Sequence, residues 1–205
     1  WNRRKSGELY LERLTITAIT DEQGQLTHYA GLFTDITQSR RQEEQIRQLA
    51  YYDALTGVPN RRLLEDRLAH AIRHAHRKEV MLAVLFLDLD HFKRINDNFG
   101  HLVGDDVLKE MCLRVTGAVR PYDALGRYGG EEFLLVFPET NLEQAQAQAE
   151  RVRQAVGNRP FQLTKETSET ITISIGVAEF REDEEIDSAV DRADKALSQA
   201  KKEGR

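Results

Sequence analysis

The amino-acid sequence predicts a mixed α/β protein whose central sheet is flanked by helices. Two observations support this class. From Asp53 to Arg205, segments with helical periodicity alternate with short apolar segments typical of strands. Within this region Val80–Leu87 is an almost continuous apolar run, as expected of a central strand covered on both faces. Taken together, the four or five strands and the helices between them predict a compact sheet with one covered face.

Local signals place the helices and strands of this region. Asn60 and Asn141 are good N-cap residues, so we expect a helix to begin beside each of them. Gly129 and Gly130 lie between two apolar segments, which predicts a hairpin with a tight two-residue turn. The expected elements, in chain order, are Arg61–Lys78, Val80–Leu87, His91–Asn98, Asp105–Val119, Ala124–Tyr128, Glu132–Phe137, Asn141–Val156, Ile171–Phe180 and Ile186–Lys202.

Residues 1–37 have the pattern of an antiparallel hairpin. Apolar and polar residues interleave over Glu8–Thr20, a polar turn follows at Asp21–Gln25, and Leu26–Thr34 is the second expected strand. An isolated hairpin of this size is marginally stable, so it needs more sheet, and we expect the natural protein to continue N-terminally. A generic β-hairpin is the alternative interpretation.

Residues 38–52 are polar and favour a helix from Gln38 to Tyr51. Ile46, Leu49 and Ala50 form only a thin apolar stripe along it. A stripe this narrow suits a two-stranded coiled coil better than a wide face turned to a core. A solvated linker helix is an equally good interpretation.

The composition is that of a soluble globular protein, with 40% hydrophobic and 31% charged residues. No apolar run approaches the roughly 20 residues that span a bilayer, and Trp1 begins no signal peptide. The single cysteine, Cys112, cannot form an internal disulfide, which fits a cytoplasmic protein. The net charge of −5 argues against a nucleic-acid polymer as partner, although a local group of cations can still bind polyphosphate.

Two pairs of acids are hard to explain structurally. Asp88 and Asp90 end the apolar strand, where an unpaired buried charge is costly. Glu131 and Glu132 follow the glycines of the turn. If the hairpin lies beside the strand, Asp88 and Glu131 converge, and converging carboxylates suit Mg²⁺ that also holds phosphate oxygens. Either pair alone is better explained as a surface turn, but the two together predict a metal site.

Four ordered motifs carry a resemblance to a known family. They are Asp53–Arg62 (DALTGVPNRR), Asp88–Asp97 (DLDHFKRIND), Phe99–Asp105 (FGHLVGD) and Arg127–Phe133 (RYGGEEF). Together they closely resemble GGDEF-type diguanylate cyclases, in the GGEEF variant, and the resemblance covers residues 53–205. It implies the palm-like sheet of nucleotidyl cyclases and polymerases. Residues 1–37 resemble the last strands of a PAS sensor domain, which makes residues 38–52 a signalling linker helix.

The resemblance implies roles for the acids. Asp88 and Glu131, helped by the backbone carbonyl of Leu89, would hold Mg²⁺, with Mn²⁺ as an alternative. Glu132 would either complete the metal shell or help to deprotonate the attacking 3′-hydroxyl. Both roles stay open, because a metal can itself lower the pKa of that hydroxyl.

The resemblance also implies a guanine pocket and a phosphate site. Asn96 and Asp105 would bind the guanine edge, and Asp105 favours guanine because it accepts from N–H groups that adenine lacks. Leu55 would form an apolar wall of the pocket. The residues near the phosphates would be Phe92, Lys93, Lys201 and Arg205. Without the resemblance, Lys201 and Arg205 are better explained as a basic helix C-terminus favoured by the dipole.

The implied reaction joins two GTP molecules into cyclic di-GMP. The 3′-oxygen of each attacks the α-phosphorus of the other, and pyrophosphate leaves twice. Each domain offers one GTP site, so catalysis requires a homodimer whose domains face each other. The alternative is a catalytically silent module that binds GTP or cyclic di-GMP and relays a signal. Loss of one of the acids would favour this alternative, and none is lost.

Arg120 and Asp123 match the RxxD pattern of the family's inhibitory product site. Five residues separate Asp123 from Gly129, and a strand of that length spans roughly 16 Å, so the pair cannot lie in the catalytic centre. Arginine can fork onto a guanine edge, and aspartate can accept from its N–H groups. The alternative is an ordinary helix-terminal arginine followed by a turn aspartate.

Overall fold

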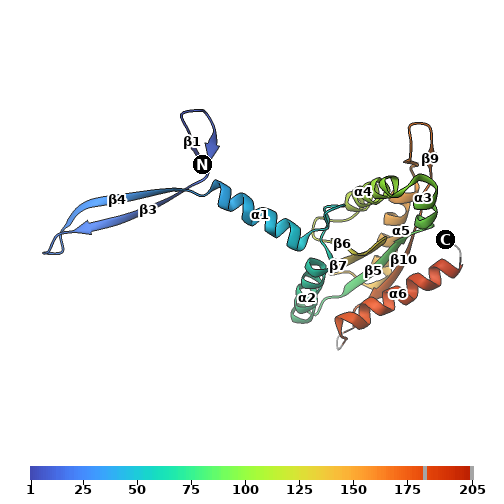
Figure 1. The fold of residues 1–205 in the computed structure, drawn as a ribbon. Helices are drawn as coiled ribbons and strands as arrows, with labels where there is room; N and C mark the ends of the chain where they lie inside the picture. Colours follow the sequence, from blue (N-terminus) through green and yellow to red (C-terminus); the bar gives the residue numbers. More distant parts are fainter. Residues whose placement is uncertain (182–183, 204–205) are drawn as a thin grey trace. The chain divides into compact units, whose positions relative to one another are not determined.

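The computed structural model describes residues 1–181 and 184–203. The chain divides into two compact units, Trp1–Ala50 and Tyr51–Arg205 (Figure 1). None of the described helices is both long enough and apolar enough to cross a bilayer.

The first unit is a set of antiparallel strands followed by a helix. Its elements are β1 (Asn2–Arg3), β2 (Leu9–Tyr10), β3 (Glu12–Thr20), β4 (Leu26–Asp35) and α1 (Thr37–Tyr51). The long first strand expected from Glu8 is divided in two. A turn in which the Gly7 N–H donates to the Arg4 carbonyl folds β2 back onto β1, so that only β3 pairs with β4.

Of residues 1–50, all of which are described, none is fully buried. One face of the β3–β4 pair is a stripe of exposed apolar side chains, in which Leu14 lies opposite Phe33. Ile46 and Leu49 on α1 are 67% and 76% exposed. The described part of this unit therefore has no core of its own, which agrees with the expectation that such a hairpin needs more sheet.

The second unit is built on an antiparallel sheet. Over the described residues it has four strands in the order β10-β5-β7-β6. Their bounds are β5 (Leu82–Leu89), β6 (Ala124–Gly129), β7 (Glu132–Pro138) and β10 (Ile173–Glu179). A short separate pair, β8 (Phe161–Gln162) and β9 (Ser168–Glu169), was not predicted.

Helices connect these strands. They are α2 (Arg61–Lys78), α3 (Phe92–Phe99), α4 (His101–Ala118), α5 (Leu142–Gly157) and α6 (Ile186–Glu203). Both predicted N-caps are confirmed, because the Asn60 side chain accepts from the Leu63 N–H and Asn141 forms a reciprocal capping box with Gln144. Helix α4 begins four residues before the predicted Asp105, directly after Gly100, whose φ of 84° separates α4 from α3.

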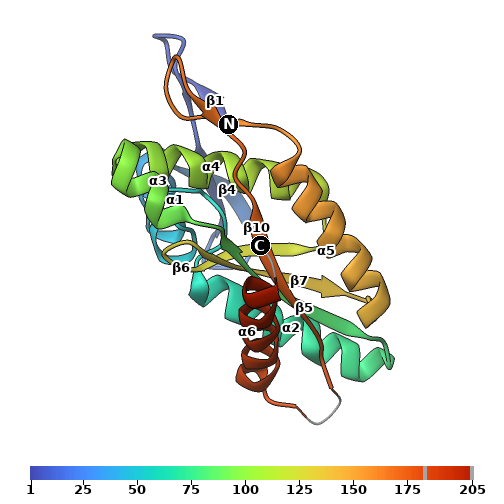
Figure 2. The ribbon, with the colours of Figure 1, turned by 90° about the vertical axis from the view of Figure 1, so that its right-hand side faces the viewer.

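Helices cover both faces of the sheet, so the expectation of one covered face was wrong. Figure 2 shows α4 and α5 on one side of the strands and α2 and α6 on the other. Leu85 and Leu87 of β5 join the buried cluster under α4 and α5, whereas Val84 and Phe86 join the cluster under α2 and α6. The unbroken apolar run of this strand correctly predicted that both of its faces are covered. The mixed α/β class is confirmed.

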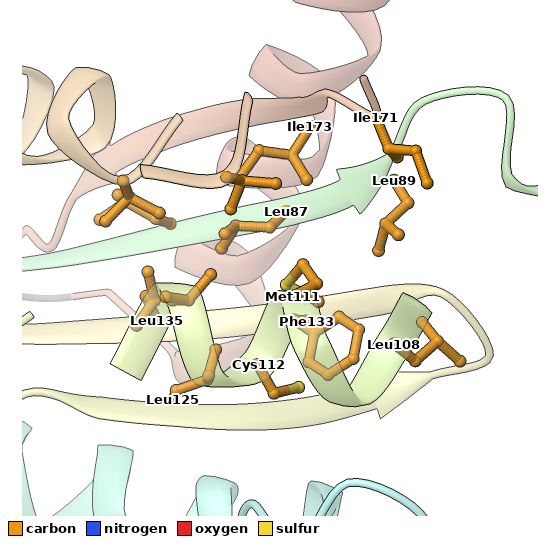
Figure 3. Close-up of a cluster of buried hydrophobic side chains, with 14 of the residues drawn as sticks. Leu87, Leu89, Leu108, Met111, Cys112, Leu125, Phe133, Leu135, Ile171 and Ile173 are labelled. Atoms are coloured by element: carbon orange, nitrogen blue, oxygen red, sulfur yellow. The ribbon is translucent and has the colours of Figure 1, made fainter. Parts of the chain in front are cut away.

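The larger cluster packs the sheet against α4. Figure 3 shows Leu87 of β5 and Phe133 of β7 beside Met111 and Cys112 of α4. Burial raises the pKa of the Cys112 thiol to about 12. Because the thiolate is the nucleophilic form, Cys112 is a structural side chain.

Helix α6 lies close against β10 at Gly176. A Cβ atom built on Gly176 would come 2.0 Å from the Ala193 carbonyl oxygen and 2.2 Å from the Leu197 nitrogen. Only glycine permits this approach of two backbones. The contact sets the position of α6 on the sheet, and with it the position of Lys201 in the last turn of that helix.

Candidate active site

The candidate site lies where β5 ends. Asp88, next to last in this strand, pairs with Ser174 of β10 on one side and with Glu132 of β7 on the other. Residues directly opposed on neighbouring strands project to the same face, so Asp88 and Glu132 share a face. It is the face of α6, because Phe86, two residues before Asp88, packs under α2 and α6.

The hairpin turn brings Glu131 to this end of the sheet. Gly129 pairs with Glu132, so the two turn residues are Gly130 and Glu131, and the prediction of a Gly129–Gly130 turn was wrong by one residue. The cause is a β-bulge between Arg127 and Gly129, which shifts the register. Neither Gly129 nor Gly130 has a positive φ.

The strand end and the turn border a small cavity of about 160 Å³. It is lined by the end of β5, the two residues after it, the start of α3, the hairpin turn and the last turn of α6: Asp88, Leu89, Asp90, His91, Phe92, Lys93, Glu131 and Lys201. The structure thus places the residues predicted to bind metal and those predicted to bind phosphate around one cavity, with two exceptions. Glu132 lies beside Asp88 without lining it, and Arg205 lies outside the described residues.

Charges are concentrated in this cavity. Lys201 Nζ lies 2.7 Å from Oδ1 of the buried Asp88. Burial raises the pKa of Glu131, and the negative charges of Asp88 and Glu132 raise it further, while Lys201 opposes them. These carboxylates are therefore close enough to repel one another, an arrangement that a divalent cation would relieve.

Asp90 holds the end of β5 to β10. It is buried, and its carboxylate accepts from the hydroxyls of Thr172 at 2.6 Å and Ser174 at 2.7 Å. Its backbone N–H also donates to the Thr172 carbonyl at 3.0 Å. Sequence patterns indicated no role for Thr172 or Ser174, because nothing local connects their hydroxyls with Asp90, which lies 82 and 84 residues earlier in the chain.

The residues predicted to read guanine lie on two consecutive helices, Asn96 on α3 and Asp105 on α4. Both are half-buried. A Cβ atom on Gly104 would come 2.0 Å from the Asn96 Oδ1 atom, so the glycine beside Asp105 makes room for the Asn96 amide. Leu55 is partly buried and packs against the larger core cluster.

The donor atoms of the cavity fit a hard divalent cation. Among the described residues, no three side chains of His, Cys, Asp or Glu are grouped to hold a metal. Asp88 and Glu131 supply two carboxylates, and Leu89 lines the cavity beside them. Mg²⁺ is commonly held by one or two carboxylates together with substrate phosphates and water. The residues present therefore suit a metal that binds together with a polyphosphate.

Comparison with known proteins identifies the family. The family described as "Diguanylate cyclase, GGDEF domain" matches residues 50–205. The chain belongs to this GGDEF family. Diguanylate cyclase DgcP of Pseudomonas aeruginosa is 43% identical over 162 residues, which are 79% of this chain and 24% of that protein. Response regulator PleD of Caulobacter vibrioides is 41% identical over 160 residues, which are 77% of this chain and 35% of that protein.

The GGDEF fold is also found among solved structures. The coiled coil and GGDEF domain of DgcB from Caulobacter crescentus, in complex with c-di-GMP, matches with a TM-score of 0.76 at 33% identity. The match covers 83% of this chain and 90% of that one. The predicted family and fold are confirmed. The chain spans only about a quarter to a third of the curated relatives DgcP and PleD, at 24% and 35% of their lengths.

The residues of the predicted second site lie at the other end of β6 in this GGDEF domain. Asp123 closes the turn before the strand, because its Oδ2 accepts from the Arg120 N–H at 2.8 Å and its own N–H donates to the Arg120 carbonyl. Oδ1 of Asp123 is buried without a hydrogen-bond partner among the described residues, and burial raises the pKa of this carboxyl. The Arg120 guanidinium is exposed, 5.8 Å from the centre of the Tyr122 ring.

Proposed function

We propose that this chain is the catalytic part of a diguanylate cyclase, which condenses two GTP into cyclic di-GMP and two pyrophosphates. The observation that carries the proposal is the convergence of Asp88, Glu131 and Lys201 on one cavity at the end of β5. Two acids that can hold a metal ion and a lysine that can neutralise phosphate are suited to phosphoryl transfer, and all three lie in the GGDEF domain of this chain. The name of the relative DgcP supports the same activity.

Recognition of the nucleotide is assigned to the two helices after β5. Asn96 and Asp105 hydrogen-bond the guanine edge, and Leu55 packs against the base. The triphosphate extends towards the cavity, where Lys93, Lys201 and the backbone at Phe92 neutralise or bind its oxygens. A buried carboxylate left unpaired by adenine would be penalised, so GTP is preferred over ATP.

The chemistry is assigned to the acids. Asp88 and Glu131, with the Leu89 carbonyl, hold Mg²⁺ or Mn²⁺, which when bound stabilises charge on the phosphates and lowers the pKa of the attacking hydroxyl. The 3′-oxygen of one GTP attacks the α-phosphorus of the other, pyrophosphate leaves, and the hydroxyl proton passes to a base. Glu132 is the candidate base, because it is exposed and projects from the same face as Asp88.

Catalysis further requires two copies of the chain, since each domain binds a single GTP. Ile46 and Leu49 are exposed on α1 and would pair two such helices as a coiled coil. We propose that the PAS-like strands and this helix control how readily two domains face each other. The substrate GTP is cytoplasmic, and we place the domain in that compartment.

Arg120 and Asp123 are proposed to bind cyclic di-GMP as a brake on the enzyme. The exposed Arg120 guanidinium can fork onto a guanine edge or a phosphate of the product. The unpartnered Oδ1 of Asp123 is an acceptor that a guanine N–H could satisfy. Product held there would keep two domains in an unproductive arrangement.

The decisive test is incubation of the protein with GTP and Mg²⁺ at high protein concentration, followed by separation of the nucleotides. We expect cyclic di-GMP from the wild type, none from Glu131→Gln, and normal activity with weaker product inhibition from Arg120→Ala. Absence of cyclic di-GMP from the wild type, despite measurable GTP binding, would favour the silent signalling module instead.

A further inference from the structure

Arg127 ties the hairpin turn to a distant loop. Its Nε and Nη2 donate to the Gly130 carbonyl at 3.0 and 2.7 Å, and its Nη1 donates to both carboxylate oxygens of Asp53 at 3.0 and 3.1 Å. The side chains of Arg127 and Asp53 are only 18% and 21% exposed. Charge-assisted hydrogen bonds are stronger than neutral ones, and in sheltered positions they can fix a local geometry.

The Asp53 end of this contact is itself rigid. Its Oδ1 accepts from the N–H and the hydroxyl of Thr56 at 2.9 and 2.7 Å, and its N–H donates to the Val58 carbonyl at 2.8 Å. Burial alone would raise the pKa of Asp53, but the hydrogen bonds from Thr56 and Arg127 hold it below its ordinary value. The carboxylate is therefore ionised at neutral pH and remains a partner for the guanidinium.

The other end of the contact fixes the peptide that carries Glu131. The Gly130 carbonyl and the Glu131 nitrogen belong to one planar peptide unit. Hydrogen bonds that hold the Gly130 carbonyl oxygen in place therefore also orient the Glu131 N–Cα bond. Gly130 depends on this support. It is exposed, it has no side chain, and a Cβ atom built on it would meet nothing within 4 Å, so no side-chain packing holds it in place.

We propose that Arg127 and Asp53 are a positioning pair that holds Glu131 where it can share a divalent cation with Asp88. This inference rests on the proposed function for the role of Glu131. Neither Arg127 nor Asp53 lines the cavity, so both act through the turn rather than on the substrate. Groups that orient metal ligands in this way typically change metal affinity or activity by about 10–100-fold when they are removed.

The test compares Arg127→Lys, Asp53→Asn and the double variant with the wild type. Lysine keeps the charge but cannot bridge Gly130 and Asp53, and asparagine keeps an oxygen for Thr56 but loses the ionic partner of Arg127. The control is Arg61→Lys, since Arg61 lies 4.3 Å from the centre of the neighbouring Tyr128 ring and pairs with Glu65. The probe is Mn²⁺ alone, followed by electron paramagnetic resonance, and then cyclase assays and melting curves.

Each of the two single variants should weaken Mn²⁺ binding and lower kcat by about 10-fold, with KM for GTP changed by less than about 3-fold. The double variant should be no worse than the more affected single one, because the two residues act as one unit. Wild-type Mn²⁺ affinity in folded Arg127→Lys and Asp53→Asn would overturn the inference, as would fully additive losses. A wild type that binds Mn²⁺ but makes no cyclic di-GMP would refute the proposed function. The comparison of Mn²⁺ affinity between the wild type and the variants would still test the role of Arg127 and Asp53.

Discussion

Lys201 of α6 lies 2.7 Å from Asp88 at the end of β5, so the main candidate metal ligand is paired with a cation of its own chain. The pairing explains how a buried carboxylate is tolerated at this position, since an unpaired charge there would be strongly unfavourable. It also means that a metal ion must compete with Lys201 for Asp88. In the proposed function, the displaced ammonium group then binds the phosphates that accompany the metal.

Replacing Lys201 should therefore affect metal and nucleotide in opposite directions. We expect Lys201→Met to bind Mn²⁺ about 3- to 10-fold more tightly in the absence of nucleotide, because a competing positive charge is removed. KM for GTP should rise by about 10-fold, because a phosphate contact is lost. Metal titration and steady-state kinetics measure the two effects. Lys202→Met, at an exposed position on the same helix, serves as the control. If Lys201→Met weakened the binding of both Mn²⁺ and GTP, Lys201 would not compete with the metal for Asp88.

The raised pKa of Glu131 predicts a pH-dependent effect on stability. Burial and the charges of Asp88 and Glu132 raise its pKa in the folded protein above the value in the unfolded chain. The folded state therefore binds this proton more tightly, so the ionised carboxylate lowers the free energy of unfolding above its folded pKa. Below the pKa that Glu131 has in the unfolded chain, the carboxyl is protonated in both states and this penalty is absent. Glu131→Gln should stabilise the metal-free protein at about pH 7 and have little effect at about pH 4.

Urea denaturation at the two pH values measures this difference, with Glu166→Gln as an exposed loop control. If Glu131 is a metal ligand as proposed, the same variant should also lose at least about 100-fold in cyclase activity, since such a ligand contributes several kcal/mol. Equal stabilisation of Glu131→Gln at both pH values would show that the effect is not electrostatic.

Sequence patterns predicted the elements well where the determinants are local. Asn60 and Asn141 cap helices within one turn of chain, so the starts of α2 and α5 followed from neighbouring residues. Strand β5 begins two residues later than Val80, because pairing with β7 starts only where Leu82 meets Pro138. The hydrophobic run shows which residues are apolar, but it does not show where the partner strand ends.

The site was predictable only in part, for a related reason. Asp88 and Glu131 stand at the ends of adjacent elements, so their convergence followed from the topology. The Arg127–Asp53 contact joins residues 74 positions apart, and nothing local shows which arginine meets which aspartate. The one-residue bulge before Gly129 depends on how two strands pair, so a glycine pattern cannot locate it.

Gly176 should be essential for the fold of the second unit. An added methyl group would meet backbone atoms of Ala193 and Leu197, which cannot rotate away as a side chain can. We expect Gly176→Ala to lower the free energy of unfolding by at least about 3 kcal/mol, because α6 must move off the sheet. Gly157→Ala is the control: its Cβ would lie 3.7 Å from Thr172 Cγ2, an ordinary contact, and it should be neutral or slightly stabilising. Urea denaturation of both variants tests the contrast.

Gly104 should control guanine recognition rather than stability. The Cβ atom of Gly104→Ala would come 2.0 Å from the Asn96 Oδ1 atom and 3.1 Å from Phe92 Cζ. Both are distal side-chain atoms, so the Asn96 amide can turn away while the helices stay in place. We expect KM for GTP to rise by about 10-fold, kcat to change little, and the preference for GTP over ITP to decline, since the pocket loses a correctly placed hydrogen-bonding group.

Gly117→Ala on the same helix provides a matched control. A Cβ atom there would meet nothing within 4 Å, so this variant should keep wild-type kinetics and gain up to about 1 kcal/mol from better helix propensity. Steady-state kinetics with GTP and ITP, together with melting curves, separate the two glycines. If Gly104→Ala discriminated between the nucleotides as well as the wild type does, Asn96 would not be the residue that reads the base. If Gly104→Ala lost stability but kept the wild-type KM for GTP, Gly104 would serve only the packing of α3 against α4.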